Sequence, residues 1–177
     1  MTTASKITLA RVALIPLYMV LMYLSAGQAG IWMWLALGVF IFASVTDFVD
    51  GYIARHYNQV SDFGKFMDPL ADKCLVVAAL CWFVENGQMA GWVLAVVLLR
   101  EFAVSGMRLV AVEKGRVIAA GWSGKIKTSS TMVCICLMLF GIPGWAERVC
   151  EVIILATTVY SGVEYFAKNL DVFKDVK

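Results

Sequence analysis

Long apolar segments constrain the fold of this chain more than any other feature of its sequence. They recur along the whole length, and 61% of the 177 residues are hydrophobic while only 16% are charged. A soluble domain has roughly 45–50% apolar and about 25% charged residues. A helix needs about 20 mostly apolar residues to cross a bilayer. The composition therefore indicates an integral membrane protein.

Six segments have the length and apolarity of membrane spans. They cover residues 7–25, 31–50, 70–84, 91–112, 128–142 and 148–166. We expect an all-α bundle of six transmembrane helices that forms a single domain over residues 1–177. The second, third and fourth segments run on into polar sequence, so we expect their helices to extend beyond the bilayer on one side.

The basic residues predict the orientation of this bundle. The connections 26–30, 85–90 and 143–147 are nearly free of Lys and Arg, and all of the fifteen basic residues except Arg100 and Arg148 fall on the other side. Cytoplasmic loops carry the excess of Lys and Arg. We therefore expect both termini in the cytoplasm of a multi-pass protein of the cell membrane, most simply the bacterial cytoplasmic membrane. The net charge of +2 is too small to indicate a nucleic acid partner.

Two pairs of aspartates stand at the predicted cytoplasmic ends of the second and third segments. Asp47 and Asp50 are three residues apart, and Asp68 and Asp72 are four apart, so each pair shares one face of its helix. An antiparallel hairpin of the two helices would gather the four carboxylates. Such a cluster favours a hard divalent cation, since like charges raise one another's pKa when uncompensated. The alternative is ordinary charge at helix ends.

Small residues and an arginine accompany the acids. Gly51 and Ala54 remove side-chain bulk along the same helix, which permits close approach of a ligand. Arg55 adds a bidentate donor for anions. Together with a bound cation, these residues predict a site for a phosphate ester or a diphosphate.

The complete pattern resembles the signature of the CDP-alcohol phosphotransferases. It reads Asp47-x-x-Asp50-Gly51-x-x-Ala54-Arg55, eight residues, Gly64-x-x-x-Asp68-x-x-x-Asp72. The resemblance implies a six-helix membrane enzyme that forms a homodimer and uses two divalent cations, Mg²⁺ or Mn²⁺. It implies that all four aspartates bind the metals and that Asp72 is the catalytic base. It also implies that the CDP moiety is bound by Asp47, Asp50, Gly51, Ala54, Arg55, Gly64 and Asp68.

The second substrate has to be inferred from other residues. Arg108, Lys125 and Lys127 are predicted on the cytoplasmic side, where they would form a basic pocket for a phosphate-bearing acceptor. Thr8 and Arg11 lie three residues apart at the cytoplasmic end of the first span. The alternative is that these cations simply snorkel to the membrane surface. Adjacent residues on a helix do not face each other, so we expect Arg100 and Glu101 each to find a partner on another helix.

These stretches are similar to the phosphatidylglycerophosphate synthase branch of the family. That similarity implies transfer of the phosphatidyl group of CDP-diacylglycerol to sn-glycerol 3-phosphate, with an active site that faces the cytoplasm and a substrate held in membrane lipid. Two alternatives stay open. One is another acceptor within the family, as in cardiolipin synthases or the transferases that use inositol phosphate or serine. The other, of a different class, is a small cation transporter.

Overall fold

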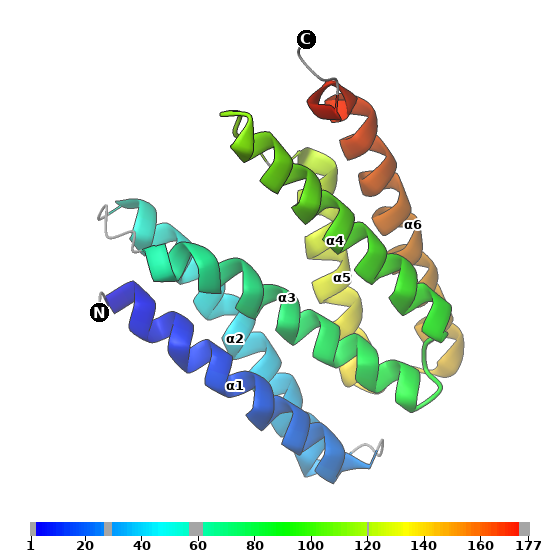
Figure 1. The fold of residues 1–177 in the computed structure, drawn as a ribbon. Coiled ribbons are helices and arrows are strands. Elements are labelled where there is room, and N and C mark those ends of the chain that lie inside the picture. The colour runs from blue at the N-terminus through cyan, green and yellow to red at the C-terminus, as the bar shows by residue number, and fades with distance from the viewer. Residues whose placement is uncertain (1–2, 27–29, 57–61, 120, 174–177) are drawn as a thin grey trace. The chain divides into compact units, whose positions relative to one another are not determined.

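The computed structural model describes residues 3–26, 30–56, 62–119 and 121–173, without the side chains at positions 3–9, 11, 47–56, 62–70 and 72. Regular structure in these residues is entirely helical (Figure 1). The helices are α1 (Thr3–Ser25), α2 (Ile31–His56), α3 (Asp62–Glu85), α4 (Gly91–Glu113), α5 (Trp122–Leu139), α6 (Gly144–Asn169) and the short 3₁₀ helix η1 (Leu170–Phe173). The predicted all-α class is confirmed.

The helices are longer than the apolar segments that predicted them. α2 continues to His56 and α3 begins at Asp62, so both extend into polar sequence as expected. α5 begins at Trp122 rather than at residue 128 and ends at Leu139. In its polar first turns the hydroxyl of Thr128 donates to the carbonyl of Gly124, one helical turn earlier, at 3.0 Å.

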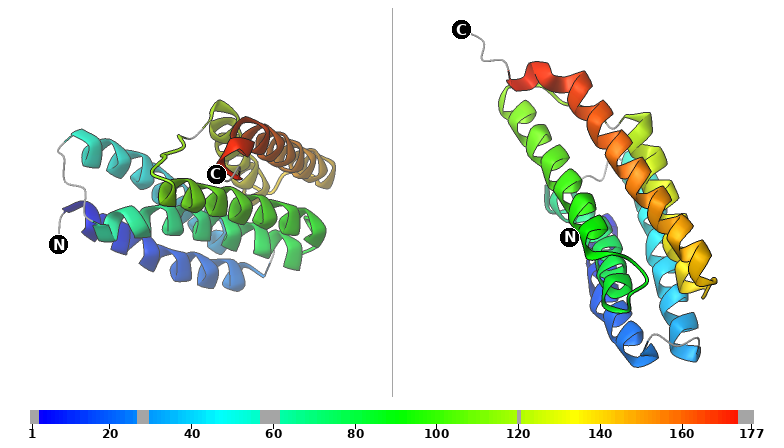
Figure 2. Two further views of the ribbon diagram at one scale, coloured as in Figure 1. Left: turned by 45° about the horizontal axis from the view of Figure 1, so that its top comes forward. Right: turned by 90° about the vertical axis from the view of Figure 1, so that its right-hand side faces the viewer.

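Residues Met1–Asn86 and Cys136–Ile142 form one compact unit. In it α1 packs against both α2 and α3. The core between them is apolar, with the rings of Tyr18 and Phe40 5.9 Å apart and both side chains fully buried. The N-terminal end of α1, the C-terminal end of α2 and the N-terminal end of α3 lie at the same end of this unit (Figures 1 and 2).

Residues Gly87–Ile135 and Pro143–Lys177 form a second compact unit. Here α4 packs against α6, and η1 contacts both helices. Val104, Met107 and Tyr165 make a buried apolar cluster near the C-terminal ends of α4 and α6. The Lys114 ammonium donates to the carbonyl of Val172 at 2.8 Å, and Arg116 pairs with Asp171. These contacts hold η1 against the end of α4.

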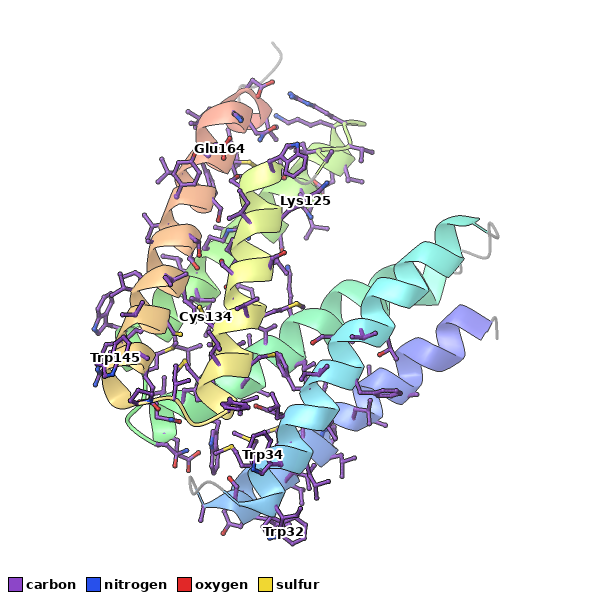
Figure 3. All side chains as sticks on the ribbon, turned by 180° about the vertical axis from the view of Figure 1, so that it is seen from behind. Trp32, Trp34, Lys125, Cys134, Trp145 and Glu164 are labelled. Carbon is purple, nitrogen blue, oxygen red and sulfur yellow. The ribbon has the colours of Figure 1, made fainter. Side chains whose placement is uncertain are left out.

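Both units expose large apolar side chains that a soluble protein would bury. Tyr23 in the first unit is 77% exposed, and Phe102 in the second is 72% exposed. Figure 3 shows Trp32 and Trp145 extending outward from their helices. Apolar exposure on this scale is typical of a surface that contacts lipid.

Length and composition identify a single membrane-crossing candidate within the described ranges, the continuous helical segment Gly144–Phe173. The apolar parts of two other helices, Val12–Ser25 and Ile31–Thr46, are shorter. The number of spans and the orientation of the termini therefore stay predictions.

Candidate active site

The aspartate signature lies on two neighbouring helices of the first unit. The part with Asp47, Asp50, Gly51, Ala54 and Arg55 belongs to α2, and the part with Gly64, Asp68 and Asp72 belongs to α3. Both acid pairs lie on helices, as predicted. Because the two halves lie at the same end of the unit, the backbone brings the whole signature to one place (Figure 1). The side chains themselves lie outside the described residues, apart from the neighbouring Ala71.

The acids continue the buried stripes of their helices. On α2 the buried side chains of Met33, Ala36, Phe40 and Ala43 recur at helical spacing, and positions 47 and 50 follow in the same register. On α3 the corresponding stripe contains Ala71, Leu75 and Ala79, and positions 68 and 72 fall in the same register, three residues before Ala71 and Leu75 respectively. Near these ends of α2 and α3, the positions in register with the buried apolar residues are therefore occupied by aspartates.

The donor set of the signature fits a hard divalent cation. Four carboxylates supply only oxygen ligands, which Mg²⁺ and Mn²⁺ prefer. Elsewhere in the described part of the chain, no group of three or more His, Cys, Asp or Glu side chains is placed to hold a metal ion. That the four aspartates hold a metal stays a prediction from the sequence.

Arg108 lies on α4 in the second unit and is oriented by α6. Its Nε donates a hydrogen bond to the hydroxyl of Tyr165 at 3.1 Å. The guanidinium also lies over the Tyr165 ring, 5.5 Å from the ring centroid. Tyr165 is buried, so Arg108 is held by a rigid partner while the rest of its guanidinium stays accessible.

Lys125 and Lys127 have different environments although both lie in the first turns of α5. The Lys125 ammonium is exposed and lies 5.0 Å from the centroid of the Trp122 ring (Figure 3). Lys127 is 5% exposed, and its ammonium donates to the Glu101 carboxylate at 2.8 Å. Residues two apart on a helix point in nearly opposite directions, so the two ammonium groups do not share one face of α5. Thr8 and Arg11 lie on α1, and their side chains lie outside the described residues.

One ionic contact differs from the sequence prediction. Glu101 pairs with Lys127 of another helix, as expected. Arg100, however, bonds to its neighbour Glu101 at 2.8 Å. The long arginine side chain reaches around the helix surface, which the rule for adjacent residues ignores. The sequence alone does not indicate this three-residue arrangement, because Lys127 is close to Lys125 in sequence and to Glu101 only in the fold.

A family model, CDP-alcohol phosphatidyltransferase, matches residues 1–162 of this chain. The chain belongs to this family. The matched region contains both halves of the aspartate signature and five of the six long helices in full, together with most of α6.

Relatives within the family resemble the chain over nearly all of its length. It is 44% identical over 186 aligned residues to the CDP-diacylglycerol--glycerol-3-phosphate 3-phosphatidyltransferase of Bacillus subtilis (strain 168), covering 96% of each chain. It is 34% identical to the probable phosphatidylglycerophosphate synthase of Mycobacterium tuberculosis (strain ATCC 25618 / H37Rv), covering 94% of this chain and 81% of the relative. A third relative, the CDP-diacylglycerol--glycerol-3-phosphate 3-phosphatidyltransferase of Rickettsia bellii (strain RML369-C), is 33% identical, with 90% and 91% covered.

Proposed function

We propose that this protein transfers the phosphatidyl group of CDP-diacylglycerol to sn-glycerol 3-phosphate, giving phosphatidylglycerol phosphate and CMP. The observation that carries the proposal is the near-complete coverage of relatives named for this reaction. Family membership also favours an enzyme over the small cation transporter that the acidic cluster alone allowed. The protein acts in phospholipid biosynthesis, where one substrate is a lipid and the other is soluble in water.

The aspartate signature supplies the donor half of the site. Asp47, Asp50, Asp68 and Asp72 would hold two divalent cations, Mg²⁺ or Mn²⁺. Bound there, such cations neutralise the charge of the diphosphate and stabilise the CMP leaving group. Gly51, Ala54 and Gly64 leave room for the CDP moiety beside the acids Asp47, Asp50 and Asp68, and Arg55 binds its phosphate oxygens.

Asp72 is the proposed catalytic base. Its carboxylate accepts the proton of the primary hydroxyl of glycerol 3-phosphate. The hydroxyl oxygen forms a bond to the phosphorus that carries the diacylglycerol, and the bond from that phosphorus to the bridging oxygen breaks. The electron pair leaves with CMP, and the proton remains on Asp72 until it passes to solvent.

The acceptor's phosphate is assigned to four basic residues and a threonine. The proposed set is Arg108, Lys125, Lys127, Arg11 and Thr8. Among those with described side chains, Arg108 and Lys125 are exposed and Lys127 is buried. We therefore assign direct phosphate contact to Arg108 and Lys125.

The proposal includes the setting of the site. Residues 1–177 form one domain with six membrane spans, both termini and the active site face the cytoplasm, and the protein is a homodimer. The exposed apolar side chains of both units support the membrane location. The cytoplasmic orientation rests on the distribution of Lys and Arg.

The test is CMP release by the purified protein in detergent micelles that contain CDP-diacylglycerol. We expect release with glycerol 3-phosphate and Mg²⁺ or Mn²⁺, and none after chelation of divalent cations. Phosphatidylglycerol, inositol phosphate and serine should give little CMP. Activity with one of these in place of glycerol 3-phosphate would contradict the proposed acceptor but leave the family assignment intact.

The base is tested by substitution. Asp72→Asn should lower kcat by about 10²–10⁴-fold, since a positioned base contributes that much. Asp62→Asn is the matched control, because Asp62 lies on the same helix outside the signature. Near-normal turnover by the Asp72→Asn variant would show that another group takes the proton.

A further inference from the structure

Three charged side chains form a cluster inside the second unit. Arg100 and Glu101 come from α4, and Lys127 comes from α5. A single oxygen, Glu101 Oε1, accepts from Arg100 Nη1 and from Lys127 Nζ, each at 2.8 Å. The side chains are only 13%, 15% and 6% exposed, respectively. Burying charged side chains in an apolar helical unit costs free energy unless they are paired, and charged groups at such positions usually have a functional role.

Glycines on two helices make room for Arg100. A Cβ atom added at Gly162 of α6 would lie 3.2 Å from Arg100 Cγ, and one added at Gly124 of α5 would lie 3.7 Å from Arg100 Nη2. The arginine therefore passes close to the backbones of both neighbouring helices. This close packing indicates that the Arg100 side chain has one fixed conformation, unlike the side chains of an exposed surface ion pair.

Apolar patterning does not determine which way the first turns of α5 face. The buried residues there are polar, namely Ser123 and Lys127, while Trp122 and Ile126 are 79% and 57% exposed. The Ser123 hydroxyl lies beside the Glu164 carboxylate of α6. Lys127 is bonded to Glu101 of α4. Directional polar contacts thus set the rotation of α5 about its axis at this end. Among them, the contact between Lys127 and Glu101 is an ion pair.

The rotation of α5 decides where Lys125 is presented. Because Lys125 and Lys127 point in nearly opposite directions, burying Lys127 against α4 turns Lys125 outward. Lys125 then lies over the Trp122 ring, exposed to a ligand.

We propose that Glu101 is a positioning residue for the acceptor: by binding Lys127 it fixes the rotation of α5 and holds Lys125 toward the phosphate of glycerol 3-phosphate. The inference rests on the proposed function for the identity of the acceptor. In this proposal Lys127 acts indirectly, as the residue that binds Glu101, and Lys125 contacts the acceptor phosphate directly.

The first experiment asks whether Glu101 acts through Lys125. KM for each substrate and kcat are measured by CMP release for E101Q, K125A and the double variant. We expect E101Q to raise KM for glycerol 3-phosphate about tenfold, the effect of one lost charge-assisted contact, and to leave KM for CDP-diacylglycerol unchanged. The double variant should be no worse than K125A. Glu113→Gln, an exposed glutamate of the same helix, is the control and should change neither KM.

The second experiment exchanges the charges. E101K and K127E should each raise KM for glycerol 3-phosphate, and the combined E101K/K127E variant should recover most of the loss because the pair is restored in reverse. Thermal unfolding midpoints without substrate, measured for the same variants, should show the same recovery. If the exchange variant does not fold, the first experiment still decides the matter.

Three results would overturn the proposal. Multiplicative effects of E101Q and K125A would mean that Glu101 acts independently of Lys125. Recovery of the unfolding midpoint without recovery of KM in E101K/K127E would mean that Lys127 itself contacts the acceptor. Equal loss for both substrates would mean general damage. If the wild type uses a different acceptor, the proposed function fails, and the same variants are scored with the acceptor that it does use.

Discussion

At the scale of single residues, the contact between Arg108 and Tyr165 makes a direct prediction. Tyr165→Phe removes the oxygen that accepts from Arg108 Nε but keeps the ring under the guanidinium. We expect the free energy of unfolding to fall by about 1 kcal/mol, the usual net value of one hydrogen bond. Titration with denaturing detergent in mixed micelles measures the change. Tyr160→Phe, which alters an exposed tyrosine of the same helix, should have no effect, and an equal loss there would refute the assignment.

The aspartate signature could be found from sequence because its spacing is local. Positions three and four apart on a helix share a face whatever the rest of the fold does, and the structure has helices over both pairs, in α2 and α3. The same rule, applied to Lys125 and Lys127, would have separated them in advance. The bond between Arg100 and Glu101 was not predictable in this way, because it depends on the rotamer of a long side chain packed beside Gly162.

At the scale of helices, Gly162 of α6 tests how closely Arg100 is packed. Gly162→Val places a branched side chain where a Cβ alone would lie 3.2 Å from Arg100 Cγ. We expect a loss of about 1–3 kcal/mol in the free energy of unfolding, the usual cost of overpacking. Gly106→Val of α4 is the matched control, since nothing lies within 4 Å of a Cβ there. Unfolding in mixed micelles should separate the two variants, and similar losses in both would argue against a tight site at Gly162.

The start of α4 depends on a carboxylate from α6. Glu151 is 8% exposed and accepts from the backbone N–H of Ala90 at 2.7 Å and from Arg148 at 2.8 Å. Ala90 is the N-cap position of α4 and makes no side-chain capping bond. Glu151→Leu should therefore lower the free energy of unfolding by about 1–3 kcal/mol, because a partly buried donor is left unpaired.

Glu151→Gln separates hydrogen bonding from charge at this position. The amide oxygen of glutamine can still accept from Ala90, so its loss in the same unfolding titration should be clearly smaller than that of Glu151→Leu. Equal losses would show that the charge of Glu151, rather than its bond to the start of α4, is what stabilises the unit.

At the scale of the whole molecule, helix boundaries were the least predictable part of the fold. Apolarity marks where a chain can enter lipid, but a helix ends where its backbone loses partners. α2 continues to His56, and α3 begins as early as Asp62. Both helices extend beyond the apolar core because polar residues can also be helical there. α5 begins earlier than its apolar segment because Ser123 and Lys127 are bound by neighbouring helices. These contacts between helices cannot be predicted from composition.

The membrane topology is the prediction that involves the entire chain. Among the described residues, Gly87, Gly115 and Gly141 lie in turns with positive φ, and nothing lies within 4 Å of a Cβ added at any of them. Gly115 lies among Arg108, Lys114 and Arg116, whereas the connections with Gly87 and Gly141 are nearly free of basic residues. Six spans with cytoplasmic termini therefore place Gly115 in the cytoplasm and the other two glycines outside it.

Reporter fusions after each glycine test this arrangement. In a bacterial host, alkaline phosphatase, which needs the oxidising compartment outside the cytoplasm, should be active after Gly87 and Gly141 and inactive after Gly115. Green fluorescent protein fused at the same positions should give the reverse pattern, which controls for expression. Phosphatase activity after Gly115 would mean that α4 does not cross the membrane in the predicted direction. The basic residues proposed to bind the acceptor would then lie on the opposite side of the bilayer from a cytoplasmic substrate, and the acceptor assignment would fall with the topology.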